Sequence, residues 1–162
     1  AEATKALSMT ESNLAIKSAL HVIISRASVD IGRLDDAEEQ CLAFQNTSLG
    51  LPSAQTAIAA IHGAIALGRG NAQEAIELTS KTIAAKSEPT PHGSYAAFAY
   101  VTQARSYEAL GDMNGARECI REARDWLLAR AEKVEDQGMR NSFLERIPEH
   151  RQILKLAGQW QV

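Results

Sequence analysis

The side chains best suited to chemistry in this sequence are two cysteines and four histidines, and they are scattered along the chain. Cys41 and Cys119 have no second cysteine and no histidine nearby in sequence. A structural zinc site needs four such ligands, usually at short spacings. Both cysteines fall in helical patterns, so we expect buried thiols in a reducing compartment. A disulfide and a metal site are the alternatives.

The four histidines, His21, His62, His92 and His150, are single residues. His21 and His62 could share a face across neighbouring helices, which would suggest a metal site. No cysteine or carboxylate cluster completes a ligand set, so the sequence favours ordinary surface or partly buried histidines. We therefore expect neither a metal nor a cofactor.

Catalytic motifs are absent from the sequence. It contains no phosphate loop, no G-x-S-x-G elbow and no His-Glu-x-x-His pair. The paired acids at 35–36 and 38–39 lie at the start of an expected helix, where negative charge complements the helix dipole. We expect no catalytic residues and no enzyme activity.

Charge and hydropathy restrict the classes of partner. The formal net charge is −3, which argues against a dedicated nucleic-acid binder. No apolar run approaches the ~20 residues of a membrane span, and the first residues do not resemble a signal sequence. We expect a cytoplasmic protein that binds neither nucleic acid nor membrane.

An internal repeat organises the elements that carry these residues. A glycine is followed five residues later by an alanine in three places: Gly32 and Ala37, Gly70 and Ala75, and Gly111 and Ala116. A small residue precedes each glycine by seven positions: Ser25, Gly63 and Ala104. Glycine can end a helix in the left-handed conformation, and small side chains let paired helices cross closely. Each copy therefore predicts a helix, a tight turn and an antiparallel second helix.

The repeat predicts a single all-α domain over residues 1–162. Its hairpins would lie at 11–46, 53–86 and 94–135, followed by capping helices at 139–160. The expected helices cover about 11–31, 34–45, 53–68, 72–86, 94–110 and 114–135, with Ser53 and Ser94 as N-caps and Pro148 starting the last helix. Residues 1–9 would be the end of a preceding repeat, so we expect the parent protein to continue upstream.

The third copy resembles the tetratricopeptide repeat. The matching residues are Ala104, Tyr107, Leu110, Gly111, Ala116 and Ala123. The family's early aromatic is kept at Tyr100 and replaced by His21 and Ala59 in the other copies. The resemblance implies a right-handed α-α superhelix of helical hairpins, with capping helices at its C-terminal end.

The tail is similar to the C-terminal end of large bacterial ATPase-containing signalling proteins and transcriptional activators. The matching residues are Arg140, Ser142, Phe143, Leu144, Pro148, Glu149 and Leu154 to Ala157. The tail's apolar residues would cover the end of the stack; they are Phe143, Leu144, Ile147, Ile153, Leu154, Leu156 and Trp160. In the alternative, this apolar surface docks a partner or a second copy.

Together the resemblances imply a non-catalytic protein–protein interaction module, whose concave face is lined by the first helix of each hairpin. That face would include Val22, Arg26, Val29, Ala60, Ala64, Leu67, Phe98, Val101, Arg105 and Glu108. Arg26 and Arg105 could hold a carboxylate or an extended peptide. Alternatively they form ordinary pairs within their helices, Arg26 with Asp30 and Arg105 with Glu108. The expected partner is a protein or peptide, with self-association as an option. An effector-sensing domain for a small molecule or short peptide is the competing hypothesis.

Overall fold

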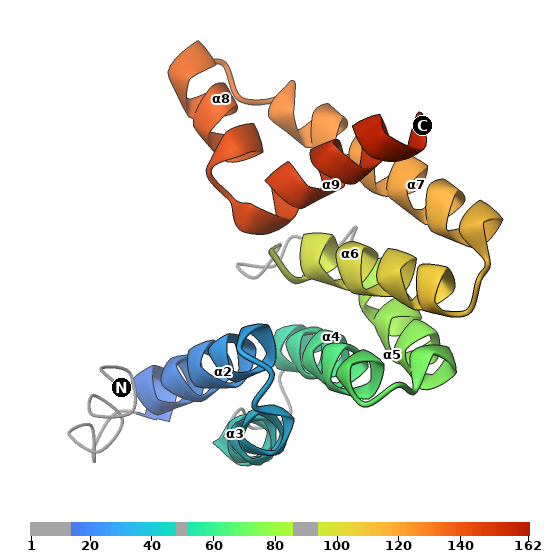
Figure 1. Cartoon of the computed structure of the whole chain (residues 1–162). Helices are drawn as coiled ribbons and strands as arrows, with labels where there is room; N and C mark the ends of the chain where they lie inside the picture. The colour runs from blue at the N-terminus through green and yellow to red at the C-terminus, as the bar shows by residue number, and fades with distance from the viewer. Residues whose placement is uncertain (1–13, 48–51, 86–93) are drawn as a thin grey trace.

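A computed structural model describes residues 14–47, 52–85 and 94–162, and within these ranges every regular element is helical (Figure 1). The helices are α2 (Leu14–Asp30), α3 (Leu34–Thr47), α4 (Pro52–Gly68), α5 (Ala72–Ala84), α6 (Ser94–Ala109), α7 (Met113–Ala131), α8 (Gln137–Glu145) and α9 (Pro148–Trp160). The predicted all-α class is confirmed. The expected end of a preceding repeat at 1–9 and His92 lie outside the described residues.

The three repeat glycines form the turns between paired helices. Gly32, Gly70 and Gly111 have φ values of 75°, 85° and 77°, which is the left-handed conformation predicted for them. At each turn the residue after the glycine donates its N–H to a carbonyl five residues earlier: Arg33 to Ser28, Asn71 to Ala66 and Asp112 to Tyr107. These bonds satisfy carbonyl groups that a helix end leaves without a partner.

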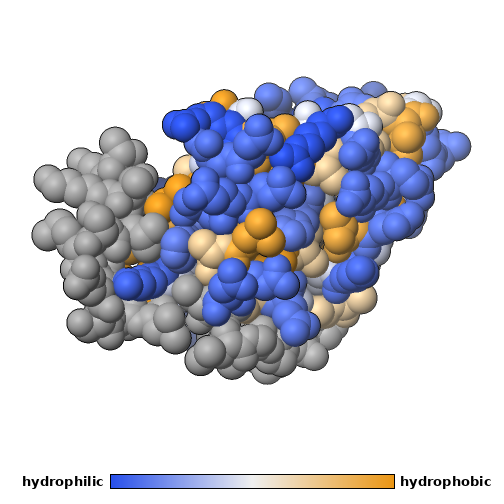
Figure 2. All heavy atoms as spheres, turned by 90° about the horizontal axis from the view of Figure 1, so that it is seen from below, coloured by the Kyte–Doolittle hydropathy of each residue, from blue (hydrophilic) through white to orange (hydrophobic). Residues whose placement is uncertain are grey.

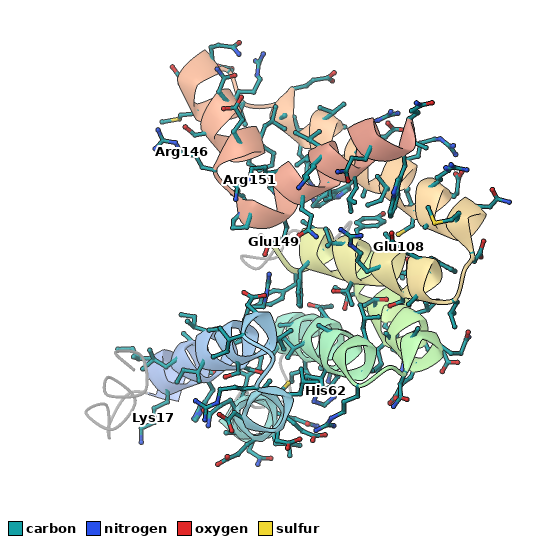
Figure 3. All side chains as sticks on the ribbon, viewed as in Figure 1. Lys17, His62, Glu108, Arg146, Glu149 and Arg151 are labelled. Atoms are coloured by element: carbon teal, nitrogen blue, oxygen red, sulfur yellow. The ribbon has the colours of Figure 1, made fainter. Side chains whose placement is uncertain are left out.

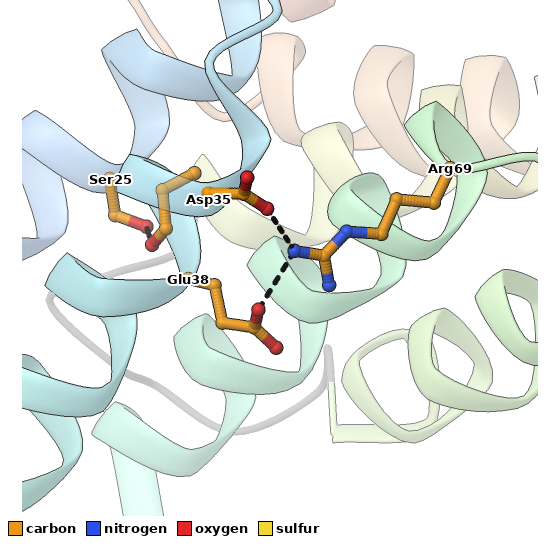
Figure 4. Close-up of polar contacts among 5 residues, drawn as sticks. Ser25, Asp35, Glu38 and Arg69 are labelled. Carbon is orange, nitrogen blue, oxygen red and sulfur yellow. Dashed lines mark hydrogen bonds and ion pairs between the residues drawn. The ribbon is translucent and has the colours of Figure 1, made fainter.

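Small residues allow the paired helices to cross at short range, as predicted. The Ser25 hydroxyl donates to the Ala37 carbonyl oxygen at 2.6 Å, which joins α2 to α3 (Figure 4). A Cβ at Gly63 would lie 2.7 Å from Thr79 Cγ2 and 3.3 Å from the Ala75 carbonyl oxygen, so α4 and α5 meet where only glycine fits. Ala104 and Ala116 are fully buried in the third hairpin.

Several helix ends differ from the sequence prediction. Helix α4 begins at Pro52, one residue before the expected cap, because proline needs no hydrogen-bond acceptor in a first turn. Helix α7 ends at Ala131 rather than near 135, and the Val134 carbonyl beyond it accepts from the Arg140 guanidinium at 3.0 and 2.7 Å. Helix α7 thus ends sooner than the sequence suggested, and Arg140 of α8 satisfies a carbonyl group just beyond that end.

Side-chain caps fix the starts of two C-terminal helices. The Asp112 carboxylate accepts from the Gly115 N–H at 2.9 Å, and the Asp136 carboxylate accepts from the Met139 N–H at 2.7 Å. Asn71, at the corresponding position before α5, makes no side-chain cap bond. Of the two short polar residues that follow a repeat glycine, Asp112 caps the next helix through its side chain and Asn71 does not.

Consecutive hairpins pack side by side, and the chain's last helix packs on the third hairpin. Helix α4 contacts α2, α3, α5 and α6, while α9 contacts both α6 and α7. Ile153, Leu156 and Ala157 of α9 are buried in the same core as Tyr100 and Ile120. In Figure 1 the ribbon traces an open C, and the first turn of α9 points back toward α2. No helix among the described residues is long and apolar enough to cross a membrane.

Candidate partner-binding surface

The residues predicted for a concave face lie on three first helices, but they differ in accessibility. Helix α2 carries Val22, Arg26 and Val29, helix α4 carries Ala60, Ala64 and Leu67, and helix α6 carries Phe98, Val101, Arg105 and Glu108. The α4 alanines and the apolar α6 residues are buried, whereas the α2 valines and Leu67 are half-buried. A partner can therefore reach the charged residues of this set, the α2 valines and Leu67.

Arg26 is the point at which α2, α6 and α9 meet. Its guanidinium lies over the Phe98 ring, with the central carbon 3.5 Å from the ring centroid. Its Nη2 donates to Glu149 Oε1, and the two groups form an ion pair. The pair with Asp30 expected within α2 is also present, with Nε 3.6 Å from Oδ1. Arg26 thus contacts both the expected carboxylate and a second one that the sequence did not suggest.

The Arg26–Glu149 pair is partly shielded from water. The Arg26 side chain is 25% exposed and the Glu149 side chain 12% exposed. Arg26 Nε is buried and has no hydrogen-bond partner. The guanidinium fork binds carboxylates best through two parallel N–H groups, and Glu149 uses one of its nitrogens. The Arg26 guanidinium therefore makes fewer hydrogen bonds to Glu149 than a two-point contact would give.

The first turn of α9 is held in place by its neighbours. His150 is buried, and its Nδ1 lies 2.8 Å from the Phe143 carbonyl oxygen of α8. The two rings meet edge-on, with centroids 4.5 Å apart. Burial lowers the pKa of His150, which favours the neutral imidazole in this position. These contacts fix the start of α9 and so direct Glu149 toward α2. Figure 3 shows Glu149 at this end of the helix.

Arg105 has a different environment from Arg26, although the two occupy equivalent repeat positions. Its Nη1 donates to Glu108 Oε2 at 2.6 Å, and both side chains are about two-fifths exposed. This is the pair within one helix that the sequence offered as an alternative. Arg26 and Arg105 share none of these partners, so the structure does not unite them in one site.

A hollow of about 140 Å³, open to solvent, lies between α3, α4 and α5 and was not predicted. Its lining includes Glu38, His62, Arg69, Asn71, Glu74 and Leu78. We call it the His62 hollow. Nε2 of His62 is buried without a hydrogen-bond partner. Burial lowers the pKa of His62, and the nearby carboxylates of Glu38 and Glu74 oppose this shift only in part.

Charged groups close one side of the His62 hollow. Arg69 Nη2 donates to Asp35 Oδ1 at 2.7 Å and to Glu38 Oε2 at 2.8 Å (Figure 4). The face seen from below in Figure 2 is mostly hydrophilic, with apolar side chains in separate patches. The sequence around His62 gave no signal for this hollow, because the hollow is formed by the spacing between α3 and α5.

The remaining candidates for metal or redox chemistry are separated in the fold. His21 Nδ1 lies 2.9 Å from Gln40 Oε1, whereas His62 lines its own hollow. The described residues contain no group of three or more His, Cys, Asp or Glu that could hold a metal ion. Cys41 and Cys119 are both buried and free, which confirms the prediction of core thiols. Burial raises the pKa of Cys41 to about 12, so its thiol stays protonated at neutral pH.

No protein-family model, curated protein or solved structure matches this chain significantly. The functional argument therefore depends on the packing, charge and contacts described above.

Proposed function

We propose that this chain is a non-catalytic protein–protein interaction module. In this proposal it is a tetratricopeptide-like right-handed superhelix, forming the C-terminal region of a multidomain bacterial signalling or transcriptional regulator in the cytoplasm. The glycine-turn hairpins support the architecture, and the tail resemblance supports the parent protein. The negative net charge supports a protein or peptide partner in preference to nucleic acid.

The observation that carries this proposal is the contact of Arg26 with Phe98 and Glu149. An arginine that lies over an aromatic ring and is 25% exposed is suited to bind a carboxylate from a partner. Glu149 supplies such a carboxylate from the protein itself. In our proposal it holds the position in the absence of a partner, and an Asp or Glu side chain of the partner replaces it.

The packing of α9 makes this replacement feasible without unfolding. Ile153 and Leu156 anchor α9 in the core, whereas Glu149 lies in the first turn of the helix. Release of the carboxylate from Arg26 therefore requires a change of the Glu149 side-chain conformation. The rest of α9 keeps its contacts with α6 and α7.

A peptide titration tests this function. An acetylated hexaglutamate peptide and its hexaglutamine counterpart are titrated into ¹⁵N-labelled protein. We expect the glutamate peptide alone to shift resonances around Arg26. Glu149→Gln should strengthen its binding about tenfold, since it removes the competing charge while keeping the side-chain shape. Arg26→Gln should abolish binding, and the matched control Arg105→Gln should keep it. Equal binding by wild type and Arg26→Gln would contradict the proposal.

The effector-sensing hypothesis remains the second candidate, and the His62 hollow favours it. Its lining combines the apolar side chains of Ile65, Ala66 and Leu78 with several polar groups, and small-molecule sites likewise combine apolar walls with a few polar groups. The unpartnered Nε2 of His62 offers such a polar group. A thermal-shift screen of metabolites against wild type and His62→Phe tests this hypothesis. A ligand that stabilises the wild type and leaves the variant unchanged would support sensing at this hollow.

A further inference from the structure

The His62 hollow is one end of a longer groove between α3 and α5. A second hollow of about 570 Å³, also open to solvent, is lined by Gln45, Asn46, Gln55, Ile58, Ala59, His62, Leu78 and Lys81. His62, labelled in Figure 3, and Leu78 line both hollows, so the two adjoin at this pair. We call the two hollows together the α3–α5 groove. Their combined volume falls within the range of about 300–1,000 Å³ that is typical of small-molecule sites.

Helical spacing aligns the groove with the length of α5. Glu74, Leu78 and Lys81 follow one another at intervals of four and three residues, which places them on one face of that helix. Glu74 lines the His62 hollow, Lys81 lines the second hollow and Leu78 lines both. The two charged side chains therefore mark opposite ends of the α3–α5 groove.

The two ends of the groove carry opposite charges that the described part of the chain leaves unpaired. In that part the side chains of Glu74 and Lys81 form no ion pair or hydrogen bond. Arg69, the cation lining the His62 hollow, already binds Asp35 and Glu38. Glu74 therefore gives this end an excess of negative charge.

The second hollow has the opposite character. Lys81 brings a positive charge to it, and the exposed side-chain amides of Asn46 and Gln55 can donate further hydrogen bonds. Ile58 and Leu78 add half-buried apolar surface between the polar groups. This end is therefore suited to a carboxylate, with an apolar side chain beside it.

We propose that the α3–α5 groove binds a short peptide with free termini in an extended conformation. The N-terminal ammonium of the peptide lies at Glu74, and its C-terminal carboxylate lies at Lys81. This inference rests on the effector-sensing candidate at the His62 hollow and names its ligand class. It does not involve Arg26.

The separation of the two charges sets the length of the peptide. Glu74 and Lys81 are seven residues apart on α5, which corresponds to about 10 Å along the helix axis. In a single amino acid the nitrogen and the carboxyl carbon are only about 2.5 Å apart. Three extended residues span about 10 Å. A tripeptide therefore reaches both charged groups, whereas a free amino acid does not.

Isothermal titration calorimetry with the tripeptide alanyl-leucyl-alanine tests this inference. We expect a dissociation constant on the order of 100 µM for the peptide with free termini. N-acetylation and C-terminal amidation should each weaken binding about three- to fivefold, because each removes one exposed ion pair. Free leucine should not bind at concentrations up to about 5 mM.

Variants assign each end of the peptide to its protein partner. Glu74→Gln should weaken binding of the free peptide about three- to fivefold but leave the affinity of the N-acetylated peptide unchanged. Lys81→Gln should show the same relationship with the amidated peptide. The matched controls are Glu77→Gln on α5 and Lys155→Gln on α9, which are exposed and line neither hollow. Both controls, and Arg26→Gln, should bind the peptide like wild type.

Three outcomes would overturn the inference. The first is a wild type that binds no tripeptide at about 5 mM. The second is equal binding of the free peptide and the peptide blocked at both ends. The third is a Glu74→Gln variant that binds the free peptide as well as Glu77→Gln does. Equal helical circular dichroism verifies that the variants fold, since the substituted residues are exposed.

The metabolite screen with His62→Phe separates failure of this inference from failure of sensing itself. If the tripeptide does not bind but another metabolite stabilises only the wild type, the peptide class is wrong and sensing at the hollow is supported. If neither the tripeptide nor any metabolite binds, both proposals are overturned. The protein-interaction function at Arg26 is tested separately by the hexaglutamate titration.

Discussion

Arg26 on α2 and Glu149 on α9 stand 123 positions apart in the sequence, yet their side chains form an ion pair. The pair links the first described hairpin to the last helix, on the side where first helices were expected to line a groove. Besides the ion pair, the Arg26 guanidinium makes a cation–π contact with the Phe98 ring beneath it. The molecule thus provides its own carboxylate at the position that the sequence assigned to a partner.

Loss of this pair should reduce stability measurably. Glu149→Gln removes the negative charge opposite a partly buried guanidinium, and we expect the free energy of unfolding to fall by about 1 kcal/mol. Urea denaturation measures this change. The control is Glu118→Gln, which breaks an exposed pair with Arg121 on α7 and should have a much smaller effect. Equal losses in the two variants would show that Glu149 contributes no more than a surface charge.

The repeat glycines should tolerate substitution poorly. Gly70→Ala places a Cβ on a residue with φ of 85°, which should cost about 1–2 kcal/mol of stability. Gly158→Ala provides the matched control, because Gly158 lies within α9 and a Cβ there meets nothing within 4 Å. It should stabilise the protein by about 0.5–1 kcal/mol. Thermal unfolding of both variants checks the opposite signs, and a stable Gly70→Ala would contradict the left-handed turn.

Mild acid should weaken the fold through its buried histidines. Burial lowers the pKa of His62 and of His150 below the ordinary value of 6.5. In the unfolded chain both histidines bind protons as pH falls through about 6.5, whereas in the folded protein they resist protonation. Proton binding therefore stabilises the unfolded state, and the free energy of unfolding decreases. We expect stability to decrease between about pH 7 and pH 5.

The variant His62→Phe isolates one of these contributions. The substitution removes one titrating group and the buried nitrogen that has no hydrogen-bond partner. The free energy of unfolding of the variant should therefore fall less than that of the wild type over the same pH range. At pH 8 both histidines are neutral in the folded and unfolded chain, and this serves as the reference. Urea denaturation at each pH gives the comparison. If the free energy of unfolding falls with pH as steeply in the variant as in the wild type, His62 does not contribute to the acid sensitivity.

The two cysteines should be unreactive in the folded protein. Cys41 is fully buried with its pKa raised to about 12, and the Cys119 thiol contacts the Tyr100 carbonyl and the Gln103 side chain. Labelling with a thiol reagent at pH 8 should modify neither cysteine in native protein and both in urea. Rapid reaction of one thiol without denaturant would show that its helix pair opens locally.

The hairpins could be predicted from sequence because their determinants are local. A recurrent glycine, a small residue before it and an alanine after it define each turn and crossing. Ser25, Gly63 and Ala37 occupy the close contacts that their sizes suggested. The core position of both cysteines was also predictable, since each lies in a helical pattern.

Other features depend on contacts that sequence spacing does not encode. The pairing of Arg26 with Glu149 results from the direction of α9 after several helix crossings. The early end of α7 is accompanied by a hydrogen bond from Arg140 to the Val134 carbonyl. The His62 hollow depends on the distance between α3 and α5, which lie in different hairpins. In each case the interacting residues were visible in the sequence, but their relative placement was not.

The link between α2 and α9 has a consequence for how the molecule opens. Most contacts in this stack join helices that are neighbours or next neighbours along the chain, so the hairpins at its ends would ordinarily fray one at a time. The Arg26–Glu149 pair links α2 to α9, so we expect these two helices to fray cooperatively. Backbone amides of α2 should then exchange with solvent at rates that depend on a residue of α9, which a purely linear array does not allow.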